Sequence, residues 1–341
     1  MRIPKFLKEG DCLGFVAPAF GCNIEPYKSG FANALKKFGN MGFRTEIGPN
    51  CYAGEGIGIS NTPEKCGSEL NTYFAKKDIG ALFSCGGGEL MCEILDYVDF
   101  EKLAGEEPKW YMGYSDNTNL IFLLATICDI VSVYGPCAPA FGMEPWHESL
   151  SDAMKLLMGK KQAFSNYPLW EKESVKDEEH PLEPYHVTEK SCIQCFPNQE
   201  VHVEGRMLGG CLDCLGRLVG TRYDKAVEFT KRYAEDGVIW YLESCDLNVM
   251  DIRRALWQLD HAGWFETARA FLIGRPLCFG EELFGLDQYQ AVTGILGKYH
   301  VPIVMDLDIG HIPPMMPVIN GAKALVDAGA KKVTVTYDLS E

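Results

Sequence analysis

Hydrophobic and polar positions in the first half of the chain predict strands that alternate with helices. Short apolar runs at 12–18, 79–85 and 109–115 have the length of buried strands and end at Gly, Pro, Ser or Cys. The segment 25–42 has helical spacing instead and closes on Gly42. Strands that alternate with helices predict a parallel sheet with helices on its faces, which is an α/β fold. Ligands of such sheets bind at the carboxyl ends of the strands.

A second α/β segment follows after an interruption. Between about 164 and 205 the chain is polar, acidic and proline-containing, which is typical of a linker or surface insertion. Beyond it, the segment 237–244 reads as a strand, and 248–263 reads as an amphipathic helix. We therefore expect three parts. They are an N-terminal α/β domain (1–165), a linker or insertion (166–204) and a C-terminal domain (205–341).

Composition and charge narrow the class of protein. The 341 residues are 47% hydrophobic and 23% charged, as in soluble globular proteins, and suffice for two domains. The formal net charge of -15 disfavours binding to nucleic acid or to an anionic membrane. No apolar run would span a bilayer, and the N-terminus lacks a signal-peptide core. We expect a cytoplasmic protein whose 14 cysteines are reduced.

The stretch GYSDN at 113–117 marks a sharp change from strand to helix at Ser115. A serine on such a turn has an exposed hydroxyl beside free helical N–H groups, which is the logic of a nucleophile elbow. Gly113 would allow another segment to approach closely. The match to G-x-S-x-G is partial, because Asn117 stands in the last position. The alternative is that Ser115 or Asp116 is simply the N-cap of the helix.

A nucleophilic serine needs a base and a group that orients the base. Of the seven histidines, His311 stands out, because it follows a strand and lies between Gly310 and two prolines that stiffen its loop. Glu243 ends the apolar strand VIWYLE, where a carboxylate needs a partner. That partner could be a histidine, or Arg253 or Arg254 in a structural ion pair.

Two further patterns have more than one interpretation. The glycines at 86–88 follow a strand and could present backbone N–H groups to a substrate oxygen, bind a phosphate, or form a plain tight turn. The pairs Cys192/Cys195 and Cys211/Cys214 form C-x2-C-x15-C-x2-C, the spacing of a four-thiolate zinc site. Because the second pair enters an apolar helix, we favour buried small thiols over a zinc ligand set.

These segments, in this order, resemble the LD-carboxypeptidase family of serine peptidases. The resemblance runs from LKEGDCLGFVAPA through SCGGGELM, KWYMGYSDNTNL, WYLESCDLNVMDIRRALWQLDHAGWF and FLIGRP to PIVMDLDIGHIPPMMP, and covers nearly the whole chain. It implies that Ser115 is the nucleophile, His311 the general base and acid, and Glu243 the acid that orients His311. It also implies an oxyanion hole formed by the backbone N–H groups of Asp116 and of the glycine turn, Gly86 and Gly87.

The same resemblance implies the architecture and the substrate class. We expect an N-terminal parallel-sheet domain related to class I glutamine amidotransferases, a smaller β-rich C-terminal domain, a site between them, and a homodimer without metal or cofactor. The substrate would be a small peptide, most simply murein tetrapeptide losing its terminal D-alanine. The alternatives are an aminoacyl-nucleotide antibiotic, as hydrolysed by microcin C immunity peptidases, and a non-catalytic module held by zinc.

The contacts that select the substrate are less determined. Long members of the family recognise a nucleobase with an aromatic residue from the insertion, where this chain offers Trp170 and Phe196 without a matching motif. Arg206, Arg253 and Lys323 are candidates for the substrate carboxylate by charge alone. The glycine turn has Cys85 where many relatives carry arginine.

Overall fold

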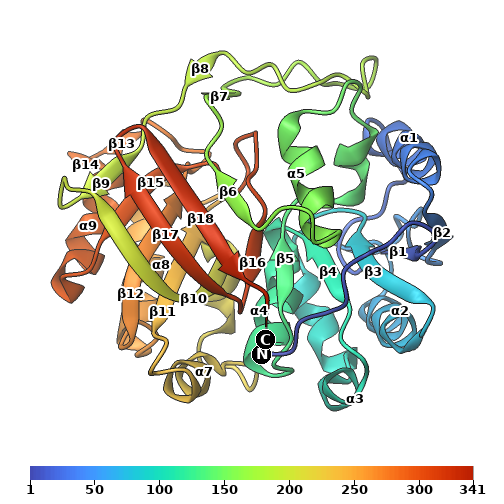
Figure 1. Ribbon diagram of the computed structural model, residues 1–341, viewed down its shortest axis with the longest axis horizontal. Helices are drawn as coiled ribbons and strands as arrows, with labels where there is room; N and C mark the ends of the chain where they lie inside the picture. Colours follow the sequence, from blue (N-terminus) through green and yellow to red (C-terminus); the bar gives the residue numbers. More distant parts are fainter. Residues whose placement is uncertain (341) are drawn as a thin grey trace. The chain divides into compact units, whose positions relative to one another are not determined.

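The apolar runs of the first half form a parallel sheet, as the alternation predicts. The computed structural model describes residues 1–340, which divide into two units. The N-terminal unit contains Met1–Lys161 and Glu173–His186; the C-terminal unit contains Gln162–Lys172 and Val187–Ser340. The segment 166–204 therefore contributes to both units. Figure 1 shows each unit as a sheet with helices packed against it.

All strand pairs in the sheet of the N-terminal unit are parallel, in the order β5-β4-β3-β1-β2. The strands are β1 (Cys12–Val16), β2 (Arg44–Ile47), β3 (Ile79–Ser84), β4 (Trp110–Gly113) and β5 (Ser132–Tyr134). The helices are α1 (Tyr27–Asn40), α2 (Pro63–Ala75), α3 (Phe100–Gly105), α4 (Thr118–Thr126) and α5 (Glu148–Leu157), with 3-10 turns η1 (Met91–Tyr97), η2 (Ser115–Asn117) and η3 (Ala138–Gly142).

An aromatic cluster fixes α1 to this sheet. Phe15 of β1 lies 5.3 Å from Phe31 and 5.8 Å from Phe38, both on α1, as measured between ring centroids. Phe83 of β3 and Phe141 of η3 complete the cluster, and all five rings are buried. The helical spacing seen in the sequence therefore places the apolar face of α1 on the sheet.

The sheet of the C-terminal unit has eight strands in the order β6-β18-β17-β10-β11-β12-β15-β9. Its centre, β10 to β15, is parallel, and the outer strands are antiparallel. The strands are β6 (Ala163–Ser165), β9 (Gln194–Phe196), β10 (Val201–Cys211), β11 (Val238–Glu243), β12 (Ala268–Gly274), β15 (Ile303–Leu307), β17 (Lys323–Gly329) and β18 (Lys332–Asp338).

Helices and short strands complete this unit. The helices are α6 (Leu212–Leu218), α7 (Ala226–Arg232), α8 (Val249–His261) and α9 (Gln288–Leu296), followed by η4 (Gly297–Tyr299); the short strands are β7 (Leu169–Trp170), β8 (Glu189–Lys190), β13 (Glu282–Leu283), β14 (Leu286–Asp287) and β16 (Val318–Asn320). Helix α8 is the amphipathic helix predicted at 248–263, and it buries Ile252, Leu256 and Leu259.

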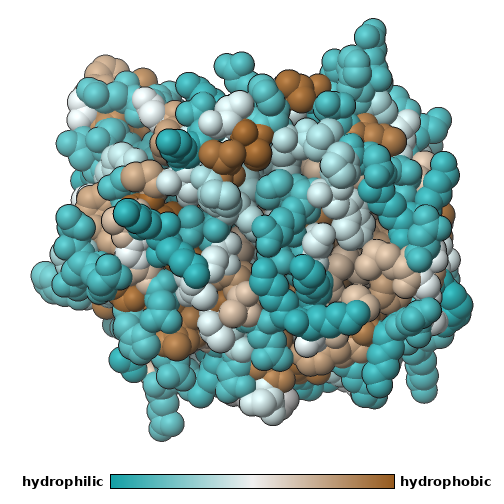
Figure 2. All heavy atoms as spheres, turned by 45° about the horizontal axis from the view of Figure 1, so that its top comes forward, coloured by the Kyte–Doolittle hydropathy of each residue, from teal (hydrophilic) through white to brown (hydrophobic). Residues whose placement is uncertain are grey.

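The expected α/β fold, with a parallel sheet in the N-terminal part and a more strand-rich C-terminal part, is thus confirmed. No helix within residues 1–340 has the length and apolar character needed to cross a membrane. Hydrophilic side chains dominate the face drawn in Figure 2, in keeping with the net charge of -15.

Candidate active site

Ser115 lies on a strained turn directly after β4. Its φ angle is 63°, in the left-handed region that a non-glycine residue adopts at a cost of about 1–3 kcal/mol. The turn leads through η2 into α4, and the N-cap positions of these two elements are Tyr114 and Asn117. Neither Ser115 nor Asp116 is therefore the helix cap, so the N-cap interpretation is wrong. A strained serine between a strand and a helix is the geometry of a nucleophile elbow.

Asn117 braces this turn, a role that the sequence did not predict. Its amide nitrogen donates to the carbonyl oxygens of Gly86 (2.8 Å) and Tyr114 (2.9 Å), and its side-chain oxygen accepts from the Tyr111 hydroxyl (2.5 Å). A Cβ on Gly113 would lie 2.7 Å from Asn117 Cγ, so the expected close approach at Gly113 is present. The residue that breaks the G-x-S-x-G pattern thus ties the serine turn to the glycine turn.

The glycine turn lies beside the candidate nucleophile. A Cβ added to Gly87 would stand 3.1 Å from Ser115 Oγ, and the Gly87 carbonyl accepts the N–H of Phe20 at 2.7 Å. The Asp116 carboxylate accepts the N–H of Met91 (2.7 Å) and the side-chain amide of Asn119 (2.8 Å). The Asp116 carboxylate is therefore engaged in structural hydrogen bonds.

His311 and Glu243 form a hydrogen-bonded pair in the C-terminal unit. His311 Nδ1 lies 2.8 Å from Glu243 Oε2, and the Glu243 side chain is fully buried while that of His311 is 12% exposed. Arg254 pairs with Asp251, and Arg253 donates to the carbonyl of Gln290. The alternative ion pair of Glu243 with either arginine is therefore wrong.

The environment of His311 favours the imidazolium form. Burial alone would lower the pKa of His311, but the Glu243 carboxylate and hydrogen bonds to Cys245 and Glu243 raise it well above its usual value. An imidazole held at Nδ1 by a buried carboxylate has a fixed ring orientation.

Two glycines allow the pair to approach this closely. Gly310 has a φ of 104°, and a Cβ there would lie 2.3 Å from Glu243 Oε2. A Cβ on Gly274, at the end of β12, would lie 2.0 Å from the carbonyl of Ile309 and 3.0 Å from Glu243 Cβ. The glycine that precedes His311 is thus required by both backbone conformation and space.

We expect Gly310→Ala to lower kcat/KM by about 100-fold, because a displacement of the pair by about 1 Å costs a factor of that size. Hydrolysis kinetics on the purified variant would check this. Gly297→Ala is the matched control, since a Cβ at Gly297 meets nothing within 4 Å. Equal losses in both variants would contradict the steric role of Gly310.

The carboxylate of Asp213 fixes the loop after β11, which carries Cys245. The carboxylate of Asp213 accepts the N–H groups of Cys245 and Asp246, each at 3.0 Å, and Cys211 Sγ lies 3.2 Å from the same carboxylate. These bonds fix the loop that carries Cys245, whose thiol donates to the Asp246 carboxylate at 3.6 Å and contributes to the raised pKa of His311. Neither Asp213 nor Cys245 was predicted from the sequence, although Cys245 lies only two positions after Glu243.

The four cysteines with zinc-site spacing do not assemble. Cys195 lies on β9 and Cys211 on β10, with β11, β12 and β15 between them in the sheet. Four strand spacings amount to about 19 Å, far beyond a shared metal ion. The zinc-held module is therefore wrong for this set, and Cys195, Cys211 and Cys214 are buried thiols as favoured.

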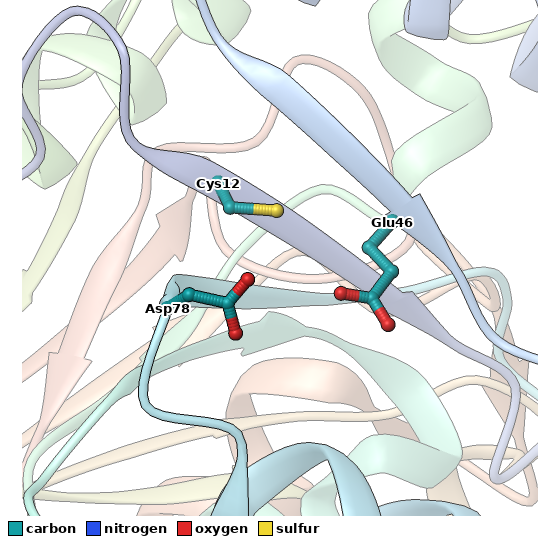
Figure 3. A group of neighbouring side chains, drawn as sticks. All are labelled: Cys12, Glu46 and Asp78. Carbon is teal, nitrogen blue, oxygen red and sulfur yellow. The ribbon is translucent and has the colours of Figure 1, made fainter.

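One group within residues 1–340 has metal-ligand geometry, namely Cys12, Glu46 and Asp78, whose ligand atoms lie within 4.8 Å of one another. Figure 3 shows their side chains converging from β1, β2 and the residue before β3. The Lys76 ammonium already bonds to Glu46 and supplies the positive charge there. Burial raises the pKa of the Cys12 thiol, which opposes formation of a thiolate ligand. We assign no metal to this group.

The basic residues considered for the substrate carboxylate have structural partners. Arg206 Nε and Lys323 Nζ bond to the two carboxylate oxygens of Asp236, at 2.7 and 2.8 Å. Arg253 is bound to the Gln290 carbonyl, as described above. None of the three is thus a free anion-binding group in this conformation.

The two aromatic candidates of the insertion also pack internally. Trp170 is buried, with the Arg275 guanidinium 5.1 Å from its ring centroid and Phe279 edge-on at 5.3 Å. Phe196, on β9, lies 6.0 Å from the Tyr289 ring. Trp170 therefore contributes to the core of the C-terminal unit rather than presenting a free face for stacking.

Comparison with known proteins places these features in a family. Residues 13–135 match the family model described as LD-carboxypeptidase N-terminal domain, and residues 204–326 match the one described as LD-carboxypeptidase C-terminal domain. The chain belongs to the LD-carboxypeptidase family. The two models together span most of this LD-carboxypeptidase chain, and they include Ser115 in the first and Glu243 and His311 in the second.

Curated relatives of the LD-carboxypeptidase chain cover it almost end to end. The microcin C7 self-immunity protein MccF of Escherichia coli is 24% identical over 97% of this chain and 94% of its own length. A probable murein peptide carboxypeptidase of Bacillus subtilis is 25% identical over 99% of this chain and 95% of its own length. Both kinds of relative fit the family, and they support peptidase activity.

A solved structure has the same fold. Microcin C7 self-immunity protein MccF in complex with aspartyl sulfamoyl adenosine superposes with a TM-score of 0.82 at 21% identity, covering 98% of either chain. At that identity the likeness establishes the architecture of this LD-carboxypeptidase.

Proposed function

We propose that this LD-carboxypeptidase is a serine carboxypeptidase that hydrolyses an L,D-amide bond, with Ser115 as nucleophile, His311 as general base and acid, and Glu243 as the acid that orients His311. The 2.8 Å bond between His311 Nδ1 and Glu243 Oε2 is the observation that carries the proposal. It fixes the ring in the orientation that a triad needs. The strained φ of Ser115 supports the choice of nucleophile.

The reaction is an acyl transfer in two steps. Ser115 Oγ attacks the scissile carbonyl while His311 Nε2 takes its proton, which requires the hydroxyl to reach that nitrogen. The imidazolium then protonates the leaving amine, and water releases the acyl group from Ser115 by the reverse proton path. The backbone N–H groups of Gly87 and Asp116 stabilise the oxyanion, and each such donor is worth about 100- to 1000-fold in rate.

The substrate that fits the proposal best is murein tetrapeptide, from which the enzyme removes the terminal D-alanine. The murein peptide carboxypeptidase among its relatives supports this choice, since it aligns over 95% of its length. The setting is the recycling of cell-wall peptides in the cytoplasm by a homodimer. The short oligopeptide has no nucleic-acid or lipid component, in keeping with the negative charge of the protein.

The second candidate substrate is an aminoacyl-nucleotide antibiotic. The specific observation in its favour is the end-to-end match to MccF and the structure of that protein with aspartyl sulfamoyl adenosine. The same triad would act. The acyl group would be the aminoacyl part, and the leaving group would be the nucleotide amine instead of D-alanine. The buried position of Trp170 counts against stacking of a nucleobase on that ring.

One preparation assayed on both substrates separates the candidates. We expect the enzyme to release D-alanine from murein tetrapeptide, which mass spectrometry would detect. The kcat/KM for this reaction should be at least tenfold above that for a processed microcin C analogue with a scissile aspartyl amide. The Ser115→Ala protein is the blank for both reactions. A higher kcat/KM on the nucleotide would select the second candidate, and no turnover of either would refute hydrolysis of these amides.

A further inference from the structure

A cavity lies in the N-terminal unit, at the amino-terminal ends of strands β3 and β4. It has a volume of about 540 Å³ and is lined by the residues that precede β3 and β4, together with Lys5, Phe6 and Asp11. Strand β4 runs from Trp110 to Gly113, and Ser115 follows its carboxyl end, so the cavity is at the opposite end of the same strand. Its volume falls in the usual range of small-molecule sites, about 300–1000 Å³.

Lys109 is the residue that distinguishes this cavity. It lines the cavity and is only 5% exposed, and its ammonium forms no hydrogen bond or ion pair within residues 1–340. Burial lowers the pKa of its ammonium group, although Glu106, Glu107 and Asp78 attract the charge. A buried ammonium without a direct partner is costly, so its retention indicates that something else supplies the partner. By contrast, the exposed Lys5 pairs with Glu107 at 2.9 Å.

Acidic groups without a cation line the same cavity. Neither Asp78 nor Glu106 forms an ion pair with a residue of the described chain, 1–340. Asp78 belongs to the group of three residues drawn in Figure 3. The nearby Lys76, which is not part of that group, bonds to Glu46. The cavity thus presents the Lys109 ammonium and the Asp78 and Glu106 carboxylates, which do not neutralise one another through direct contacts. The exposed Lys77 also lines it and has no ion pair within residues 1–340.

We propose that this cavity binds a small zwitterion, an α-amino acid, whose carboxylate is held by Lys109 and whose ammonium is held by Asp78 and Glu106. Charges of both signs in one cavity exclude a simple anion or cation as the best match, because either would leave the other set unpaired. The choice of amino acid rests on the proposed function, since the reaction releases one.

The test uses the Ser115→Ala protein, so that binding is measured without turnover and is independent of the proposed catalysis. Isothermal titration and saturation-transfer NMR with D-alanine should give a 1:1 complex, with acetate and methylammonium binding at least tenfold more weakly. Adding Lys109→Met should weaken D-alanine binding by at least tenfold. The control Lys102→Met replaces an exposed lysine on α3 of the same unit and should leave binding unchanged.

A second measurement covers the case in which Lys109→Met fails to fold. Acetylation of the folded Ser115→Ala protein with acetic anhydride, mapped by mass spectrometry, should show Lys109 protected at least threefold by D-alanine and Lys102 not protected. Asp78→Asn should weaken binding while leaving the thermal unfolding midpoint of the protein in place. Equal binding by acetate, retention of affinity in Lys109→Met, or absence of protection at Lys109 would each overturn the proposal.

Discussion

Replacement of Ser115 by alanine is expected to lower kcat by a factor on the order of 10⁶, with little change in KM. Loss of a triad nucleophile has an effect of that size, because the remaining groups cannot form the acyl-enzyme. Binding of the ground-state substrate would persist, since the hydroxyl of Ser115 contributes mainly in the transition state. Release of D-alanine from murein tetrapeptide, measured under single-turnover conditions, checks the prediction.

The control for Ser115→Ala is the same substitution at a serine that is not expected to affect activity. Ser68, exposed on α2 of the same unit, provides it as Ser68→Ala. A Ser115→Ala protein that retained the rate of the Ser68→Ala protein would show that another group is the nucleophile. The alanine at 115 would also adopt the left-handed conformation without the serine hydroxyl, so unfolding should be monitored to separate activity from stability.

Replacement of Glu243 by glutamine is expected to lower kcat by about 10⁴, the loss seen when the orienting acid of a triad becomes an amide. The amide cannot stabilise the imidazolium formed on His311 and favours the wrong tautomer. Because the Glu243 carboxylate raises the pKa of His311, its removal should lower that pKa. The base acts only when unprotonated, so activity rises with pH through the His311 pKa, and this rise should move to lower pH in the variant.

The measurement is kcat/KM as a function of pH for both proteins, from about pH 5 to 9. Glu282→Gln, on the exposed strand β13 of the same unit, is the control that changes net charge by the same amount. If the rise of kcat/KM with pH had the same midpoint in the Glu243→Gln protein, this rise would not report a His311 pKa that Glu243 raises.

Much of the fold follows from patterns in the chain, since strands β1, β3 and β4 and helices α1 and α8 match predicted segments. The buried apolar residues of these elements recur at the spacing of a strand or a helix, and this pattern can be read from neighbouring residues alone. The edge strands β6 and β9 were not predicted, because two- or three-residue strands have too few positions to show a period. What makes them strands is pairing with β18 and β15, which are distant in sequence.

The candidate site shows the same division between local and distant information. Ser115 and Glu243 each stand at the end of a predicted strand, and His311 lies in the loop that follows one, which the sequence shows. Asn117 and Asp213 form hydrogen bonds with backbone groups of other loops. The residues next to them in the sequence do not indicate these bonds. The spacing of the four cysteines suggested a zinc site that the structure does not form. Spacing along a chain does not determine how far apart two residues lie across a sheet.

The single amide of Asn117 has a wider consequence. By donating to the carbonyls of both Gly86 and Tyr114, it links the serine turn to the glycine turn in the absence of any ligand. An inhibitor that forms a tetrahedral adduct, such as a peptidyl boronic acid, would then meet a receptor that is already shaped. Its capture by this half of the enzyme would not have to wait for these two loops to rearrange.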